Sequence, residues 1–466
     1  MIVNMKDTIA AISTPQGYGG IGIVRISGEE SLTITSRIFK KTKSSNEKDK
    51  HHLTPRKLYH GFATDPEKNR IVDEVLTVFM PSPNSYTGED VVEFQAHAGT
   101  IVLKKILELI LKQGARLAQP GEFTRRAYLN GRMDLSQAEA VMDIIQAKTD
   151  LSLNLAAKNL EGALGATTRN IKEKLIDITA MVEAKIEFPE DIEGETDDTD
   201  EIIEKCGYVI ASLEEMVDAY KNGTAIRDGL RLVIVGRANV GKSSLLNRFL
   251  RRDRAIVTEI PGTTRDSIEE VLNIHGLPVI LVDTAGLRES DDPVEQIGME
   301  RTRRLSEQAD LILFMVDAGK GILPEDKKIY QEIESKAKIL VINKTDLLKT
   351  KERMAYPEEW AFIDVCKTSL KINSGVDVLK DKIFTFGTHG FQVNGGSIVP
   401  NLRQGMLFEN AYVAVETARK NLKEGMSLDL AAIDLKVAMD AMDEITGDSV
   451  KTDVMDAVFS RFCIGK

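Results

Sequence analysis

Cysteine is scarce in this chain of 466 residues, and its three cysteines, Cys206, Cys366 and Cys463, lie far apart in the sequence. An odd number of widely spaced cysteines gives no disulfide framework, and it lacks the paired spacing that a zinc site needs. We therefore expect a protein of the reducing cytoplasm.

Long apolar runs are also missing from the sequence. No stretch of about 18 or more apolar residues occurs, which argues against a membrane-spanning helix. The first residues, MIVNMKDTIAAIS, have no basic flank before their apolar stretch. For that reason we do not expect a secretory signal.

Positive charge is in deficit, because 61 lysines and arginines face 72 aspartates and glutamates and the net charge is −11. This balance argues against a protein that coats nucleic acid by bulk attraction. Local clusters remain at Arg125-Arg126, Arg251-Arg252-Arg254 and Arg301-Arg303-Arg304. We interpret each of them as a solvated helix face or loop.

Apolar residues make up 42% of the chain, which is ample for packed cores, and the length corresponds to about three domains. The N-terminal part mixes strand-like runs with one helical stretch, which is typical of an α+β domain. Ser136 and Glu139 then form a capping-box pattern that opens a long helical region. The expected parts are an α+β domain at 1–120, the first half of an all-α domain at 121–222, an inserted α/β domain at 223–386, and the second all-α half at 387–466.

Residues 232–243 read LVIVGRANVGKS, an apolar run that ends in Gly236 and leads to Gly241-Lys242-Ser243. This is the pattern of a phosphate-binding loop between a buried strand and a helix. The glycines let backbone N–H groups turn toward a polyphosphate, Lys242 places a positive charge beside its β and γ oxygens, and the Ser243 hydroxyl reaches Mg²⁺. Taken alone, the pattern also fits a glycine turn that holds no ligand.

Three further motifs indicate which nucleotide the loop binds. They are Thr263-Thr264 in PGTTRD, Asp283-Thr284-Ala285-Gly286, and Asn343-Lys344-Thr345-Asp346. Each of them follows or lies near a β-rich run. Alternating strands and helices predict a doubly wound parallel sheet whose loops gather at one edge. Asp283 is expected to hold the magnesium through water, and the Gly286 amide is expected to sense the γ-phosphate.

The last of these motifs, Asn343-Lys344-Thr345-Asp346, indicates which base is bound. The Asp346 carboxylate suits the N1–H and N2–H₂ donors of guanine, which adenine lacks. Asn343 and Lys344 brace that pocket, and Ser369-Leu370-Lys371 is expected to cover the base. The sequence thus predicts a GTPase that binds its nucleotide through Asn239, Val240, Gly241, Lys242, Ser243, Ser244, Thr258, Glu259, Ile260, Pro261, Gly262, Thr263, Thr264, Asp283, Thr284, Ala285, Gly286, Asn343, Lys344, Asp346 and Ser369.

One catalytic element of small GTPases is missing. Many of them place a glutamine after the Asp-x-x-Gly motif to orient the attacking water, and here that position is Leu287. The chain is then either a slow GTPase that acts only as a binder, or an enzyme that replaces the glutamine. We favour the enzyme, with Lys242 at the phosphates, Asn239 holding a monovalent cation in place of an arginine finger, and Glu295 orienting the water. Potassium, unlike sodium, is expected to stimulate hydrolysis.

Three segments outside this domain carry a resemblance. SYTGEDVVEFQAH, PGEFTRRAYLNGRMDLSQAEAV and the terminal FCIGK closely resemble the MnmE (TrmE) family of tRNA-modification GTPases. The resemblance runs from IGIVRISG to Lys466. It implies an N-terminal folate-binding domain that dimerises, a helical domain, and an inserted Ras-like P-loop GTPase domain.

The resemblance also implies a reaction and a partner. A homodimer would work with MnmG, an FAD-containing protein, on certain tRNAs. Together they would add an aminomethyl or carboxymethylaminomethyl group to C5 of the wobble uridine, U34. The carbon would come from formyl- or methylene-tetrahydrofolate. GTP hydrolysis would drive a conformational cycle rather than the uridine chemistry.

Carried over residue by residue, the resemblance implies folate contacts, two kinds of metal ligand and a glutamate important for hydrolysis. The implied folate contacts are Arg25, Glu89, Arg132 and Lys466. The implied K⁺ ligands are Asn239, Thr258, Ile260 and Thr263, the implied Mg²⁺ ligands are Ser243 and Thr264, and the matching glutamate is Glu295. Without the resemblance, we would interpret these positions instead as a strand-end arginine, a turn glutamate and a surface lysine.

Some points stay open at this stage. Cys463 is either a small buried apolar residue or a catalytic thiol near the folate pocket. Ala98, Ala238 and Leu370 depart from the family pattern without removing a ligand. A ribosome-assembly switch of the Era or EngA kind is the alternative function, although the sequence has no GXXG loop in a basic C-terminal domain. The absence of long heptads disfavours a polymerising GTPase.

Overall fold

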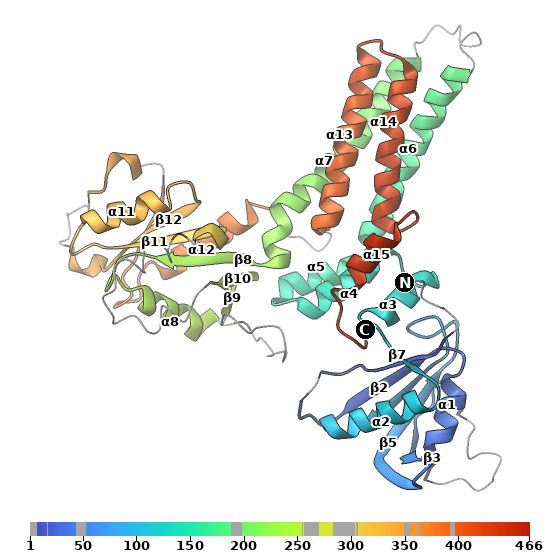
Figure 1. The fold of residues 1–466 in the computed structure, drawn as a ribbon. Helices are drawn as coiled ribbons and strands as arrows, with labels where there is room; N and C mark the ends of the chain where they lie inside the picture. Colours follow the sequence, from blue (N-terminus) through green and yellow to red (C-terminus); the bar gives the residue numbers. More distant parts are fainter. Residues whose placement is uncertain are drawn as a thin grey trace. The chain divides into compact units, whose positions relative to one another are not determined.

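Figure 1 shows the fold of a computed structural model of the chain. The structure describes residues 7–15, 17–42, 53–187, 198–253, 255, 270–282, 303, 306–348, 355–360, 363–391 and 397–466. The chain divides into two compact units, one made of Met1–Met142 with Asp443–Lys466 and the other of Asp143–Met442. None of the helices in the described part is long and apolar enough to cross a bilayer.

The first unit contains a seven-stranded sheet in the order β3-β4-β5-β6-β2-β1-β7. Its pairs are antiparallel except for the parallel pair of β1 and β7. The strands are β1 (Ile9–Ile12), β2 (Gly22–Ser27), β3 (Phe39–Lys41), β4 (Tyr59–Asp65), β5 (Arg70–Met80), β6 (Val91–Ala96) and β7 (Arg116–Leu117).

Helices α1 (Ser31–Ile38) and α2 (Thr100–Lys112) share a hydrophobic core with this sheet, in which Val24 and Ile26 of β2 take part. Successive side chains of a strand point to opposite faces. Arg25 and Ser27, which alternate with Val24 and Ile26, therefore point to the other face. The pleat of β2 thus separates a dry face from a face that carries polar groups.

Helix α3 (Glu122–Leu129) packs on that second face through Phe123, which joins Ile9 and Ala11 in a small apolar cluster. The C-terminal residues reach the same place, beyond α15 (Thr452–Phe459). Ile464 forms an isolated antiparallel β-bridge with Pro120. The Phe123 amide donates to the Lys466 carbonyl at 3.2 Å. Segments from both ends of the sequence therefore build one side of this unit.

The second unit combines helices with another sheet. Its helices before and after that sheet in the sequence are α5 (Asp150–Leu160), α6 (Ala163–Glu187), α7 (Asp198–Asp228), α13 (Leu402–Lys423) and α14 (Leu428–Thr446), and α4 (Leu135–Gln146) and α14 run across the boundary between the units. Helices α7 and α13 lie side by side (Figure 1), with an ion pair of 3.0 Å between Lys221 and Glu409. The chain thus leaves the helices at the end of α7, forms the sheet, and returns to them in α13.

The sheet of this unit has the order β13-β12-β11-β8-β10-β9. All neighbours are parallel except the antiparallel pair of β9 and β10. The strands are β8 (Leu230–Val235), β9 (Glu270–Ile274), β10 (Leu277–Leu281), β11 (Leu311–Asp317), β12 (Lys338–Asn343) and β13 (Asp364–Lys367).

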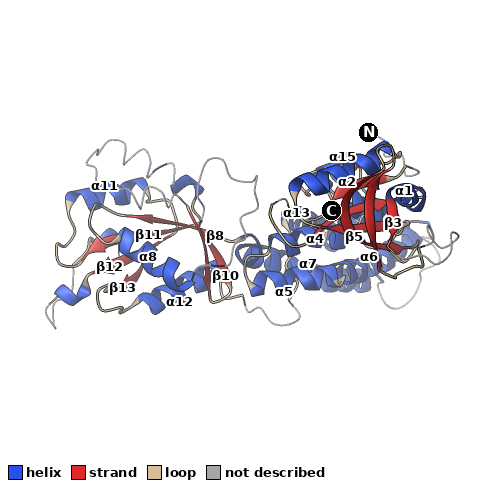
Figure 2. Ribbon diagram, turned by 90° about the horizontal axis from the view of Figure 1, so that it is seen from below, coloured by secondary structure: helices blue, strands red, loops and turns tan. Residues whose placement is uncertain are grey.

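Helices cover both faces of this sheet. Helices α8 (Lys242–Asp253) and α12 (Val376–Thr388) share one core with it, and α11 (Pro324–Glu332) shares another together with the buried Trp360 of a short 3₁₀ helix, Glu358–Trp360. Figure 2 shows α11 on one side of the sheet and α8 and α12 on the other. The predicted multidomain fold is confirmed, with an α+β part, an all-α part, and a doubly wound parallel sheet between two groups of helices.

Candidate functional site

The loop between β8 and α8 makes a tight turn beneath the neighbouring strands. Gly236 and Gly241 have φ values of 151° and 110°, and Asn239 between them has a φ of 63°. A Cβ atom on Gly236 would collide with the Met315 carbonyl oxygen of β11, and one on Gly241 with the Asn343 side chain. Both positions therefore require glycine, for the space and for the left-handed backbone.

Lys242 is the first residue of α8, and its side chain folds back into the loop. The ammonium nitrogen donates to the Gly236 carbonyl at 2.6 Å and to the Arg237 carbonyl at 2.8 Å. Burial lowers the pKa of this lysine. An entering phosphate would offer the ammonium an anionic partner in place of two neutral carbonyls, which is the role that the sequence predicts for Lys242.

Two carboxylates hold the loop from outside. Arg237 donates its Nε to both oxygens of the fully buried Asp326 on α11, at 3.2 and 3.1 Å. Lys344 donates to the Asn239 carbonyl at 2.8 Å and to Asp317 at 2.7 Å. Sequence reasoning missed both aspartates. The available signal was the position of Asp317 at the carboxyl end of an apolar strand, LILFMVD.

Beside the loop lies a cavity of about 360 Å³, lined by Gly241, Ser244, Asn343, Lys344, Asp346, Leu347, Leu370 and Lys371. The Ser369 hydroxyl donates to the Asp346 carboxylate at 2.5 Å, which leaves the other carboxylate oxygen for a ligand. The Asn343 amide donates to the Val240 carbonyl at 2.8 Å, and its oxygen accepts the Leu370 amide at 3.4 Å. Asn343 thus ties the loop to the segment predicted to cover the base.

The structure therefore gathers the described members of the predicted nucleotide site at one edge of the sheet. These are Asn239, Val240, Gly241, Lys242, Ser243, Ser244, Asn343, Lys344, Asp346 and Ser369. The remaining members lie outside the described residues, and their roles stay predictions: Thr258, Glu259, Ile260, Pro261, Gly262, Thr263, Thr264, Asp283, Thr284, Ala285, Gly286 and the predicted catalytic residue Glu295.

In the first unit, two of the predicted folate contacts lie on one aromatic ring. The guanidinium carbon of Arg25 is 5.3 Å from the centroid of the Tyr86 ring, and that of Arg132 is 6.0 Å from it. Arg25 also lies 5.6 Å from the Phe123 ring and donates to Glu93 at 2.8 Å. Cation–π contacts of this kind hold two positive charges close together on one face of the sheet.

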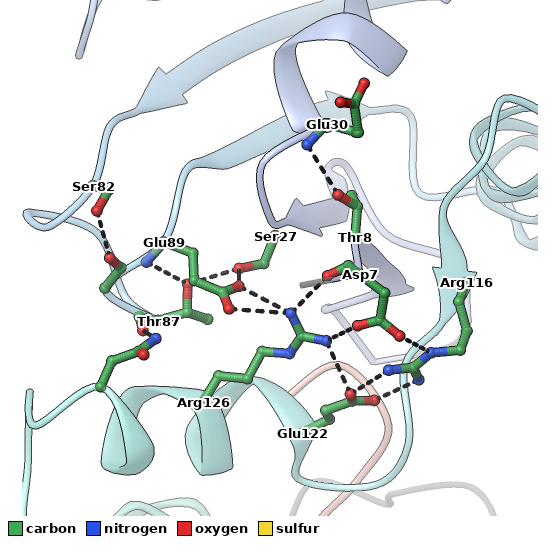
Figure 3. Close-up of polar contacts among 12 residues, drawn as sticks. Asp7, Thr8, Ser27, Glu30, Ser82, Thr87, Glu89, Arg116, Glu122 and Arg126 are labelled. Atoms are coloured by element: carbon green, nitrogen blue, oxygen red, sulfur yellow. Dashed lines mark hydrogen bonds and ion pairs between the residues drawn. The ribbon is translucent and has the colours of Figure 1, made fainter. Parts of the chain in front are cut away.

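The other predicted folate residues lie in the same neighbourhood. The Glu89 carboxylate accepts the Ser27 hydroxyl at 2.7 Å (Figure 3). Ser27 is two residues from Arg25 on the same face of β2. The Lys466 carbonyl accepts the Phe123 amide. Cys463 is exposed, so its interpretation as a buried packing residue is wrong.

A cluster of ion pairs around Arg126 holds the Glu89 carboxylate in place (Figure 3). The Arg126 guanidinium is completely buried and donates to Glu89 at 3.1 and 3.2 Å, to Asp7 at 2.5 Å and to Glu122 at 3.3 Å. Arg116 joins Asp7 and Glu122 to the cluster. Our interpretation of Arg126 as part of a solvated helix face was wrong, because three carboxylates from different segments enclose it.

The charges in this cluster perturb its acids. Burial by itself raises the pKa of Asp7, but hydrogen bonds from Arg116 and Arg126 outweigh it and bring the pKa below its ordinary value. Burial likewise raises the pKa of Glu122, and the hydrogen bonds from Arg116 and the Gln119 amide lower it below the ordinary value. Both carboxylates are therefore ionised at neutral pH and balance the two guanidinium groups.

Comparison with known proteins identifies the family of the chain. A family model described as MnmE helical domain matches residues 135–463, and one described as GTP-binding protein TrmE N-terminus matches residues 8–132. A protein of Carboxydothermus hydrogenoformans named tRNA modification GTPase MnmE is 44% identical over 99% of this chain and 100% of its own length. The chain belongs to the MnmE family.

Proteins of the same name in Alkaliphilus metalliredigens and Streptococcus pneumoniae are 43% and 42% identical, over 99% and 100% of this chain and the whole of each relative. The predicted resemblance is thus confirmed over the full chain, which decides against the ribosome-assembly alternative. This MnmE-family protein is a GTP hydrolase that acts in tRNA modification. GTP and Mg²⁺ are the ligands that the family implies, and tRNA is the substrate.

We predict that Arg126→Met destabilises the first unit by about 3–5 kcal/mol, because it removes the completely buried guanidinium and leaves Arg116 as the remaining cation for Asp7 and Glu122. The measurement is amide hydrogen exchange in β1 and α3 of the full chain under native conditions. As a control, Lys105→Met removes the exposed pair with Glu108 and should leave that exchange unchanged. Equal exchange in both variants would mean that the buried cluster contributes little.

Proposed function

We propose that this MnmE-family GTPase works as a homodimer with an FAD-containing, MnmG-like partner. The pair adds an aminomethyl or carboxymethylaminomethyl group to C5 of the wobble uridine of certain tRNAs, in the cytoplasm. The carbon comes from formyl- or methylene-tetrahydrofolate bound to the first unit. The observation that carries this proposal is that Arg25 and Arg132 share the Tyr86 ring, with Glu89 bonded to Ser27 on the same strand as Arg25 and the Lys466 carbonyl bonded to the Phe123 amide.

The chemistry of that neighbourhood suits a folate. Arg25 and Arg132 offer two cations to the anionic glutamate tail, in charge-assisted hydrogen bonds. The Glu89 carboxylate, held by Ser27 and Arg126, offers an acceptor edge to the N–H and amino groups of a pterin. The exposed Cys463 supplies a thiol on the same C-terminal segment as Lys466, and we propose that it helps to activate the uracil or the one-carbon unit.

Potassium activation is supported by the way the cations around the phosphate loop are engaged. Arg237 is paired with Asp326, and Lys344 with Asp317 and the Asn239 carbonyl. Neither side chain is free to act as an arginine finger on the developing phosphate charge. An added cation would supply that charge, held by Asn239 together with Thr258, Ile260 and Thr263.

Magnesium and water complete the proposed hydrolytic site. The Ser243 hydroxyl stands at the start of α8, and hydroxyl oxygens are ligands that Mg²⁺ accepts. Thr264 would be the second protein ligand, and Glu295 would orient the water that Leu287 cannot hold. We further propose that the GTPase parts of two protomers approach each other at the transition state, which moves the helices attached to them.

Nucleoside analysis of tRNA tests the proposed function. In cells whose only copy carries Lys242→Ala, we expect the modified wobble uridine to disappear from bulk tRNA, because the phosphates lose their ammonium partner. Mass spectrometry of digested tRNA measures this. The control is Lys328→Ala, an exposed lysine of α11 in the same unit, which should leave the nucleoside unchanged. Intact wobble modification together with defective ribosomal subunits would contradict the proposal.

Titration with formyl-tetrahydrofolate tests the folate site separately. Arg25→Ala should weaken binding by about tenfold or more, since a charge-assisted contact to the folate tail is lost. Arg37→Ala, an exposed arginine on α1, is the matched control and should bind like the native chain. Unchanged affinity in Arg25→Ala would remove this residue from the site.

A further inference from the structure

Lys344 lines the base cavity and also makes two contacts outside it, with Asp317 and with the phosphate loop. Its side chain lines the cavity, while its ammonium nitrogen lies 2.7 Å from Asp317 and 2.8 Å from the Asn239 carbonyl. Its backbone is left-handed, with a φ of 63°. A lysine rarely adopts that conformation unless its surroundings fix it.

Asp317 is built into the sheet in a way that fixes its carboxylate. It ends β11, directly opposite Asn343 at the end of β12, and only 4% of its side chain is exposed. One carboxylate oxygen accepts the Gly319 amide at 2.9 Å and the other accepts Lys344. Burial raises the pKa of Asp317, but these hydrogen bonds outweigh burial and bring the pKa below its ordinary value.

We propose that Asp317 is a positioning residue for the guanine nucleotide, which acts by pinning the Lys344 ammonium against the Asn239 carbonyl. The lysine stem then forms a fixed wall of the base cavity. The same pin joins that wall to the phosphate loop, so that the base and the phosphates meet a single preformed surface. The inference concerns GTP binding alone and does not depend on the folate or potassium proposals.

The physical basis is the rotamer freedom of lysine. An unpinned lysine samples many conformers in solution and must lose that freedom when a ligand packs on it. A lysine held at its tip has already lost it, so the nucleotide binds a preorganised site. Preorganisation of Lys344 should raise the affinity for the nucleotide. We expect this increase to appear as slower release, because affinity differences among variants of one site lie mostly in the dissociation rate.

The test measures release of fluorescent GDP by stopped flow in the full chain, at fixed K⁺ and Mg²⁺. Asp317→Asn keeps the side-chain shape and an oxygen for the Gly319 amide, but it removes the charge that holds Lys344. We expect release to become about tenfold faster, equivalent to about 1.4 kcal/mol. The matched control is Asp364→Asn, which breaks the Lys382 pair on β13 of the same sheet and should change release by less than about twofold.

A double variant separates positioning from a general structural role. If Asp317 acts through Lys344, Asp317→Asn should not accelerate release further in a Lys344→Met background. Thermal unfolding without nucleotide gives a second readout. Lys344→Met should lower the melting temperature, because the buried Asp317 carboxylate loses its cation and keeps only neutral hydrogen-bond donors, and adding Asp317→Asn should restore part of the loss. The proposal would be overturned if the rate increases of the two single variants multiplied in the double variant, or if Asp317→Asn alone left the release rate unchanged.

Discussion

The ammonium group of Lys344, shared between Asp317 and the Asn239 carbonyl, is the contact on which the nucleotide site depends. It is available only because β8, β11 and β12 are parallel neighbours whose carboxyl ends meet at one edge. Each strand supplies one part of the contact: the loop after β8, the last residue of β11, and the residue after β12. The Asp317 carboxylate is buried while the Lys344 side chain is one third exposed, so water competes for the lysine but hardly for the carboxylate.

Much of the nucleotide site could be predicted from the sequence. Gly236, Lys242 and Asp346 stand in ordered motifs at strand ends, and the rule that parallel strands present their ends together brings such motifs into one site. Asp317 and Asp326 could not be assigned in this way. Their function lies in pairing with Lys344 and Arg237, and which carboxylate meets which cation depends on how the β11–α11 segment packs against the loop.

In the first unit, too, the sequence predicts the class of the fold but not the pairing of its charged side chains. The strand-like runs and the helical stretch of its sequence predict the α+β class, since alternation and periodicity are local properties. The burial of Arg126 is not local. Glu122 lies one turn away on the same helix, but Asp7 and Glu89 come from two other segments, and only the folded chain brings them to the guanidinium. The aromatic partners of Arg25 and Arg132 were likewise invisible, because Tyr86 and Phe123 belong to different elements.

At the phosphate loop, Arg237 is bound to Asp326, Lys242 to two loop carbonyls, and Lys344 to Asp317 and the Asn239 carbonyl. Among the described residues, Arg237 and Lys344 are therefore not available as a catalytic charge, and our proposal assigns that charge to a bound potassium ion. That assignment is tested most directly by the rate of GTP hydrolysis in KCl and in NaCl at equal ionic strength, for the native chain and for Asn239→Ala. We expect potassium alone to stimulate the native chain, and the variant to lose this response while it still binds GDP. Equal rates in the two salts would contradict the need for an added ion.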